Sequence, residues 1–239
     1  MDRQHRRDLK HDRFVDEVGS LTTSARENQK LIIAITAAVV AVALIGYGIY
    51  FYRSNREKQA QSALAKAISA IDSPLIQPGQ PNPDAKFRTE PERAAAAEAM
   101  FRDVQKKYSG TDASDVANLY LARIAASKND TATARKLLQD FIAEHPEHLL
   151  VGAARYSLYE LRINNGEAAQ VASELTQELS KTENQVLPGD TMLMLLAHAY
   201  EVEGNAEKTK ETYRRIITEY PDSPYAVDAQ RRVGSSAQS

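Results

Sequence analysis

The sequence predicts an all-α fold in which one transmembrane helix is followed by a solenoid of stacked helical hairpins. Three observations lead to this prediction: an uncharged run of 22 residues near the N-terminus, apolar residues at helical spacing through most of the remaining chain, and a spacing that returns at offsets of 37 and 75 residues. Alanine is abundant, and the chain contains neither cysteine nor tryptophan. This composition favours helices and excludes a disulfide framework.

The uncharged run, LIIAITAAVVAVALIGYGIYFY, covers residues 31–52. As a helix it would be roughly 33 Å long, enough to cross a hydrocarbon core of about 30 Å. A cleaved export signal has an apolar region of only about 7–15 residues. A buried core helix would need a large surrounding domain, but only 30 very polar residues precede the run. Tyrosines and Arg53 at its C-terminal end resemble an interfacial aromatic belt with a polar stop, so we predict a transmembrane helix at residues 31–52.

Charge counts leave the orientation of this helix open. The polar tail at residues 1–30 carries seven Lys/Arg interspersed with six acids. Within about 15 residues of the membrane, the basic residues are more numerous on the C-terminal side: Arg53, Arg56, Lys58 and Lys66 against Arg26 and Lys30. A short basic tail crosses a membrane poorly, whereas long domains translocate largely regardless of charge. We therefore expect the N-terminus to be cytoplasmic and the large domain to lie outside.

The 187 residues from Arg53 to Ser239 have 23 basic and 26 acidic side chains, which gives no electrostatic footprint for nucleic acid. Without cysteine, thiolate metal sites and a cysteine nucleophile are excluded. The sequence also lacks the glycine-rich, serine-elbow and H-E-x-x-H motifs of common enzyme classes. We expect no catalysis, no cofactor and no small-molecule substrate, although an enzyme with an acid–base pair scattered among the helices remains the alternative.

After the membrane run, apolar residues at i, i+3 and i+4 predict that the helix continues as a membrane-proximal helix at residues 53–72. Residues 73–90 contain four prolines and one glycine, so we predict a loop there. Pro91 suits the first turn of the next helix, and residues 91–239 form the predicted repeat domain.

One spacing of four residues recurs through the repeat domain, in the second helix of each predicted hairpin. Turn signals fall at matching offsets, at Asn129-Asp130, Gly166 and Gly204-Asn205. Self-similarity at this period is typical of stacked helical hairpins. The copies are Ala97, Phe101, Val104, Tyr108; Ala134, Leu138, Phe141, His145; Thr209, Tyr213, Ile216, Tyr220; and a degenerate set, Val171, Leu175, Glu178, Thr182.

The segment YLARIAASKNDTATARKLLQDFIAEHP, residues 120–146, resembles a tetratricopeptide repeat. Ala122 and Ala134 lie at the small positions of the first and second helix, and Pro146 ends the unit. Small residues let paired helices approach closely. The resemblance implies a tetratricopeptide-like α-solenoid, and an ordinary helical bundle with coincidental spacing is the alternative.

In such an array the first helices line a concave face that binds peptides. Repeat position predicts a protein-binding groove lined by Tyr120, Arg123, Tyr156, Glu160 and His198, with an ordinary solvated face as the alternative for each. His145 and His148 form an H-x-x-H pair that could bind a metal. We expect packing and solvent contacts for this pair and predict no metal site.

The whole architecture resembles the bacterial ancillary SecYEG translocon subunit family. The polar tail with LKHDRFVDEVGSLTTSARENQKL, the single span, the alanine-rich helix and the ending YRRIITEYPDSPYA carry this resemblance. It implies an inner-membrane protein with a periplasmic tetratricopeptide-like domain that binds the Sec translocon and exported polypeptides or chaperones. The EYPDSPYA element also occurs in other envelope proteins, so the alternative is a tetratricopeptide protein of envelope assembly or cell division that acts as a structural tether.

Overall fold

The computed structural model describes residues 29–77, 79, 82–181 and 186–235. These residues form helices and loops, with one isolated bridge between Leu75 and Phe87 and no strand, so the predicted all-α fold is confirmed. The chain divides into two compact units, residues 1–56 and residues 57–239. Most of the predicted polar tail and Thr182 of the degenerate repeat lie outside the described residues.

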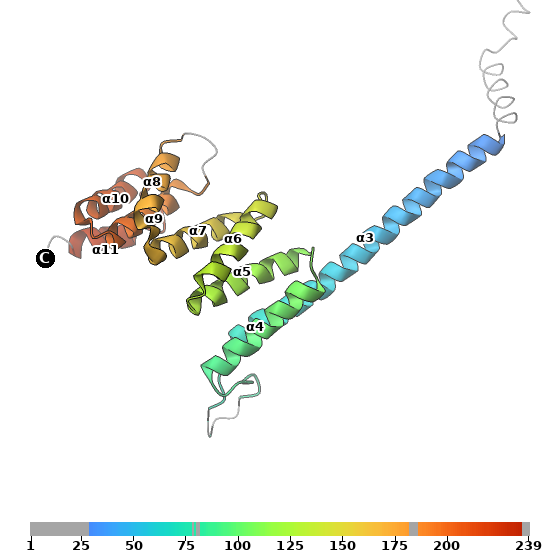
Figure 1. The fold of residues 1–239 in the computed structure, drawn as a ribbon, viewed down its shortest axis with the longest axis horizontal. Coiled ribbons are helices and arrows are strands. Elements are labelled where there is room, and N and C mark those ends of the chain that lie inside the picture. The colour runs from blue at the N-terminus through green and yellow to red at the C-terminus, as the bar shows by residue number, and fades with distance from the viewer. Residues whose placement is uncertain (1–28, 78, 80–81, 182–185, 236–239) are drawn as a thin grey trace, which may run out of the picture. The chain divides into compact units, whose positions relative to one another are not determined.

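Figure 1 shows the helices in chain order. Their bounds are α3 (Gln29–Ile71), α4 (Glu90–Lys107), α5 (Asp112–Ser127), α6 (Thr131–Glu144), α7 (Val151–Arg162), the π-helical segment η1 (Ile163–Glu167), α8 (Ala168–Leu179), α9 (Gly189–Val202), α10 (Ala206–Glu219) and α11 (Ala226–Ser235).

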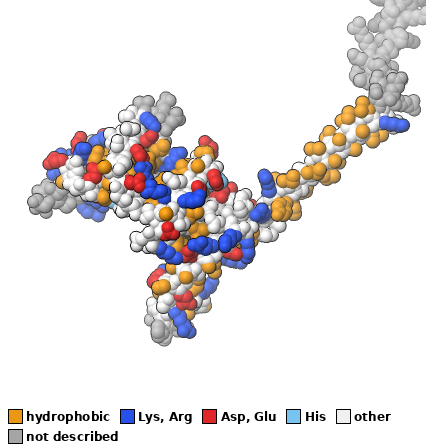
Figure 2. Space-filling view, viewed as in Figure 1, with side chains coloured by type: hydrophobic (Ala, Val, Ile, Leu, Met, Phe, Trp, Pro, Cys, Tyr) orange, Lys and Arg blue, Asp and Glu red, His pale blue; other side chains and the backbone are white. Residues whose placement is uncertain are grey.

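The N-terminal part of α3 could cross a membrane. Every large apolar side chain described between Leu31 and Tyr52 is more than half exposed, and none of the helix's most apolar 18-residue window is buried. Figure 2 shows these side chains along α3, whereas charges of both signs are mixed over the visible face of the second unit. Exposed apolar surface of this extent requires an apolar environment, which a bilayer supplies.

The C-terminal part of α3, residues 57–71, packs inside the first hairpin of the second unit. The Glu57 carboxylate accepts hydrogen bonds from the backbone N–H groups of Asp112 (3.0 Å) and Ala113 (3.3 Å), at the start of α5. This part of the predicted membrane-proximal helix therefore serves as the first helix of the array, and α4 is the second. Their shared core contains Ala60, Leu64, Ala67 and Ala70 of α3, Ala97, Phe101 and Val104 of α4, and Ala113, Ala117 and Leu121 of α5.

The loop between α3 and α4 ends one residue earlier than the sequence predicts. The Thr89 hydroxyl accepts a hydrogen bond from the backbone N–H of Glu92 (3.3 Å), so Thr89 caps α4, and Pro91 lies in the first turn. Ser73, at the other end of the loop, is buried, and its backbone carbonyl accepts a hydrogen bond from Arg93 Nη1 (2.7 Å). Both ends of the loop are thus attached to the hairpin that it closes.

The later hairpins turn at the residues that the sequence marks as turn signals. Asn129, Gly166 and Gly204 have positive φ values of 60°, 87° and 74° and follow α5, α7 and α9. Asp130 and Asn205 then cap α6 and α10, each accepting a backbone N–H hydrogen bond from three residues ahead at 3.1 Å. Between α7 and α8 the chain passes through η1, and no side chain caps α8. The third hairpin therefore shares its turn position with the others but not its local stabilisation.

The recurring four-residue spacing places its apolar members in the core. Phe101 of α4, Phe141 of α6, Leu175 of α8 and Ile216 of α10 are all buried. The second helices of the four hairpins are thus α4, α6, α8 and α10, and the first helices are residues 57–71 of α3, α5, α7 and α9, with α11 following the last hairpin.

The buried side chains form three clusters along the array. The middle cluster, between α5, α6 and α7, is mostly alanine: Ala122, Ala125, Ala134 and Ala154, with Leu138, Phe141 and Leu161. The C-terminal cluster is centred on α8–α10 and contains larger side chains, among them Leu175, Met192, Leu193, Leu195, Leu196 and Ile216. Small side chains leave more space between helices than large ones, and an open groove lies beside the middle cluster.

Candidate functional site

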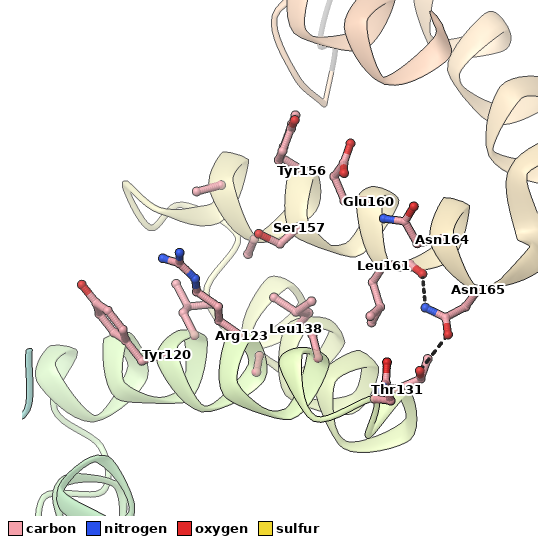
Figure 3. A pocket seen from close by; sticks show the side chains of 16 residues that line it. Tyr120, Arg123, Thr131, Leu138, Tyr156, Ser157, Glu160, Leu161, Asn164 and Asn165 are labelled. Carbon is pink, nitrogen blue, oxygen red and sulfur yellow. Dashed lines mark hydrogen bonds between the residues drawn. The ribbon is translucent and has the colours of Figure 1, made fainter. Parts of the chain in front are cut away.

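A groove of about 600 Å³ lies between α5 and α7, within the second unit (Figure 3). Its apolar lining consists of small or branched side chains that belong to the middle cluster or border it: Leu119, Ala122, Ala126, Leu138, Ala153, Ala154 and Leu161. Its polar lining comes from both helices and includes hydroxyl, amide and charged groups. Such a combination of apolar surface and a few convergent polar groups is typical of binding sites.

Four of the five residues predicted for a groove line this one. Tyr120 and Arg123 come from α5, and Tyr156 and Glu160 come from α7. His198, on α9, is not among the lining residues, but its Nδ1 lies 3.0 Å from Glu160 Oε1. The structure therefore brings four of these side chains to one groove and joins the fifth to it through Glu160.

The two tyrosines of the groove are held in place by core contacts. The Tyr120 ring stacks on the buried Phe101 ring, with centroids 4.7 Å apart and planes 7° apart. Tyr156 packs against the C-terminal cluster, and burial together with the neighbouring Glu160 carboxylate raises its pKa above the usual tyrosine value. These contacts pre-organise the groove walls, and they also mean that alanine replacement of either tyrosine would disturb packing.

The two charged groups of the groove differ in their surroundings. Glu160 forms an ion pair with His198 whenever the imidazole is protonated. Arg123 is exposed and has no ion-pair or hydrogen-bond partner among the described residues. Figure 3 shows its guanidinium extending from α5 toward the side of the groove formed by α7. The unbalanced charge of the groove lining is therefore positive.

A hydrogen-bonded pair links the α6 start to η1 at one end of the groove. Thr131 Oγ1 donates to Asn165 Oδ1 (2.8 Å), and Asn165 Nδ2 donates to the Leu161 carbonyl (2.6 Å), as the dashed lines in Figure 3 show. Both polar ends of the Asn165 amide are thereby used within the protein. Asn165 therefore serves the architecture of the groove rather than ligand contact.

An ion-pair network supports the same turn. Glu167 pairs with Arg135 of α6 and with Arg162 of α7, and Arg162 also forms a bidentate pair with Glu174 of α8 at 2.7 Å. The hydrogen bonds from Arg135 and Arg162 lower the pKa of the Glu167 carboxyl to about 2. The network thus joins three helices around the turn that has no cap.

The H-x-x-H pair is engaged in packing. The His145 and His148 rings lie 5.3 Å and 5.2 Å from the Phe141 ring, centroid to centroid. His145 Nε2 lies 3.3 Å from Asp115 Oδ2, and His148 Nδ1 accepts a hydrogen bond from the backbone N–H of Leu150 at 3.0 Å. Within the described residues, no three His, Asp or Glu side chains come close enough together to hold a metal ion.

Sequence reasoning missed two exposed polar groups of the groove, Ser157 and Asn164. Together with Glu160 they lie at i, i+3 and i+7 along the α7 sequence, which places them on one side of the helix. Extending the predicted positions by helical spacing would have found both.

Comparison with known protein families gives two matches. The family described as tetratricopeptide repeat-like domain matches residues 26–187, and the family described as tetratricopeptide repeat matches residues 192–223. Neither is a catalytic family, and domains of this kind are protein–protein interaction modules. Searches of curated proteins and of solved structures gave no match.

Proposed function

We propose a function from the premise that this chain belongs to the tetratricopeptide repeat-like domain family: it is a membrane-anchored scaffold of the bacterial envelope that binds other proteins in the groove between α5 and α7. Domains of this family bind other proteins. The observation that carries the proposal is the groove itself, in which apolar surface and polar groups from two first helices face a common space. Solenoids use such concave surfaces for binding.

The apolar part of α3 supports the membrane anchor. Its exposed side chains match the length and composition of a transmembrane helix, and the same helix continues into the first hairpin of the array. A scaffold tethered in this way meets its partners at the membrane at raised effective concentration, so individually weak contacts suffice. A groove with few fixed charges suits recognition of many related segments better than recognition of one tight ligand.

The finer assignment follows from the family resemblance of the sequence. We propose that the domain is periplasmic, that the N-terminus is cytoplasmic, and that the partners are the Sec translocon and the exported polypeptides or chaperones near its exit. In the alternative, a passive envelope tether, the span would matter and the groove would not.

Site-specific photo-cross-linking in intact bacterial cells tests the scaffold function. A photoreactive residue at Ser157, which is exposed in the groove, should capture translocon subunits and exported polypeptides. The same residue at the exposed Glu211, on α10 and outside the groove lining, is the matched control and should capture fewer of them. Equal capture from both positions would contradict binding in the groove.

A groove-filling variant tests the same proposal without disturbing the tyrosines. Ala153 is exposed and lines the groove, so Ala153→Arg should block access and abolish capture while helicity and membrane insertion persist. Ala169→Arg makes the same change at an exposed position of α8 outside the groove lining and should leave capture intact. Full activity of Ala153→Arg in cells would favour the tether.

Protease accessibility tests the orientation. Protease added to spheroplasts should degrade the repeat domain if it is periplasmic, while intact cells protect it. Full protection in spheroplasts would reverse the orientation.

A further inference from the structure

Arg123 is the groove residue whose charge nothing in the described structure balances. We infer that the groove between α5 and α7 binds an extended peptide segment carrying an acidic side chain, whose carboxylate pairs with Arg123. The inference rests on the proposed protein-binding function and gives its partner a chemistry.

The charges of the groove favour an acidic rather than a basic ligand. Glu160 is paired with His198 at 3.0 Å, so its carboxylate is already partly satisfied, whereas Arg123 has no ion-pair or hydrogen-bond partner among the described residues. A guanidinium offers planar, bidentate hydrogen bonding that matches a carboxylate. A lysine or arginine of a ligand would meet the exposed Arg123 charge without a free carboxylate to offset it.

The volume of the groove fits a short segment. One turn of an α-helix, about 10–12 Å wide and 5.4 Å long, fills roughly 400–600 Å³. The groove, at about 600 Å³, therefore holds little more than a single helical turn, and a longer helix would lie mostly outside it. An extended chain uses the same space with side chains alone, because alternate residues point to the same side.

The polar groups of α7 also favour an extended chain. Ser157 and Asn164 are exposed and line the groove, and each offers both donors and acceptors. A helical ligand satisfies its own backbone groups, whereas an extended segment needs partners for its N–H and C=O groups. Hydroxyl and amide side chains along one wall supply such partners independently of the ligand sequence.

The alanine surface sets the residues next to the acid. Ala122, Ala126 and Ala154 present small methyl groups, backed by Leu138 and Leu161. Apolar side chains of small to medium size, such as alanine or valine, would bury surface against them without displacing the tyrosine walls. The ligand we infer thus has one acidic residue flanked by small apolar residues.

Peptide binding to the full-length protein in lipid nanodiscs tests this inference. The probes are three fluorescent ten-residue peptides of alanine, valine and serine with a central Glu, Gln or Lys, and affinities are measured by fluorescence anisotropy. We expect the Glu peptide to bind about three- to tenfold more tightly than the Gln peptide, as for a partly exposed arginine–carboxylate pair. The Lys peptide should bind most weakly.

Charge variants identify the residue responsible. Arg123→Gln should reduce the affinity for the Glu peptide to that for the Gln peptide, and Arg123→Glu should reverse the preference toward the Lys peptide. Arg214→Gln, at an exposed position of α10 outside the groove lining, should retain the preference for Glu. Circular dichroism should show unchanged helicity in all three variants.

Equal affinity for the three peptides, no measurable binding of the Glu peptide, or an unchanged preference in Arg123→Gln would overturn the inference. Cross-linking from Ser157 separates this failure from failure of the proposed function. If partners are still captured there while peptides show no preference for an acid, the groove binds proteins of another chemistry. If capture also fails, both proposals fall.

Discussion

The α9–α10 hairpin and the α7–α8 hairpin occupy equivalent repeat positions but are stabilised differently. In α9–α10, Gly204 makes the turn with positive φ, and the Asn205 side chain caps α10. In α7–α8, Gly166 makes the equivalent turn, but Glu167 stands where the capping residue would be and turns its carboxylate to Arg135 and Arg162. The repeat period is thus kept while a backbone cap is exchanged for ion pairs between helices.

The two hairpins also differ in their cores. The first helix of one, α9, buries Met192, Leu193 and Leu196 almost completely. The first helix of the other, α7, buries Ala154 and Leu161 and exposes the polar side that lines the groove. A first helix that gives up large core side chains can present a binding surface, and the neighbouring ion-pair network is one way to hold it in position.

Core truncation should show the largest difference between these regions. Leu193→Ala, on α9, should lower the free energy of unfolding by about 3–5 kcal/mol, because it leaves a cavity in a fully enclosed core. Leu161→Ala, on α7, should cost about 2 kcal/mol, because that side chain borders an open groove that water already enters. Urea unfolding of the full chain in detergent, followed by tyrosine fluorescence, measures both. Equal losses would mean that the middle cluster is as tightly packed as the C-terminal one.

The ion-pair network should give the next largest effect. The Arg162 side chain is only 16% exposed and binds two carboxylates, so Arg162→Met should cost about 1–3 kcal/mol and leave Glu167 and Glu174 with fewer partners. Arg215→Met removes a more exposed pair within α10 and should cost less than about 0.5 kcal/mol. Similar losses in the two variants, in the same unfolding measurement, would show that the network adds nothing beyond a surface pair.

Loss of the cap in α10 should have a smaller effect. Asn205→Ala removes the side-chain oxygen that accepts the Lys208 N–H and should cost about 1 kcal/mol. Asn164→Ala makes the same chemical change at an exposed groove position and should change stability by less than about 0.5 kcal/mol. Thermal unfolding followed by circular dichroism compares the two. A destabilised Asn164→Ala would indicate a structural role for that side chain.

The smallest effect should be a pH dependence specific to the α7–α8 turn. Because the folded-state pKa of Glu167, about 2, lies below its ordinary value of 4.5, the carboxylate stabilises the fold above pH 4.5. This contribution is lost as the pH falls from 4.5 toward 2, and partial exposure limits it to less than about 1 kcal/mol. Unfolding free energies at pH 6 and pH 3 should differ less in Glu167→Gln than in the native protein. An identical pH dependence in both would contradict the contribution of this pair.

The sequence alone determined the features that depend on local chemistry. Helical spacing identified the span and the second helices, and Asn129, Gly166 and Gly204 marked the turns because few other residues adopt a positive φ. Repeat position also selected Tyr120, Arg123, Tyr156 and Glu160, which line one groove. These predictions succeed because residues close in sequence carry them. What the groove binds remains a prediction.

Only the tertiary structure decided which side chains meet across helices. It placed residues 57–71 of α3 inside the first hairpin, through the contacts of Glu57 with the start of α5. It also joined Glu160 to His198, a residue 38 positions away, and left Arg123 without a partner among the described residues. Such pairings depend on the angle and depth at which helices pack, and these follow from the sizes of all the side chains between them rather than from the spacing along any one helix.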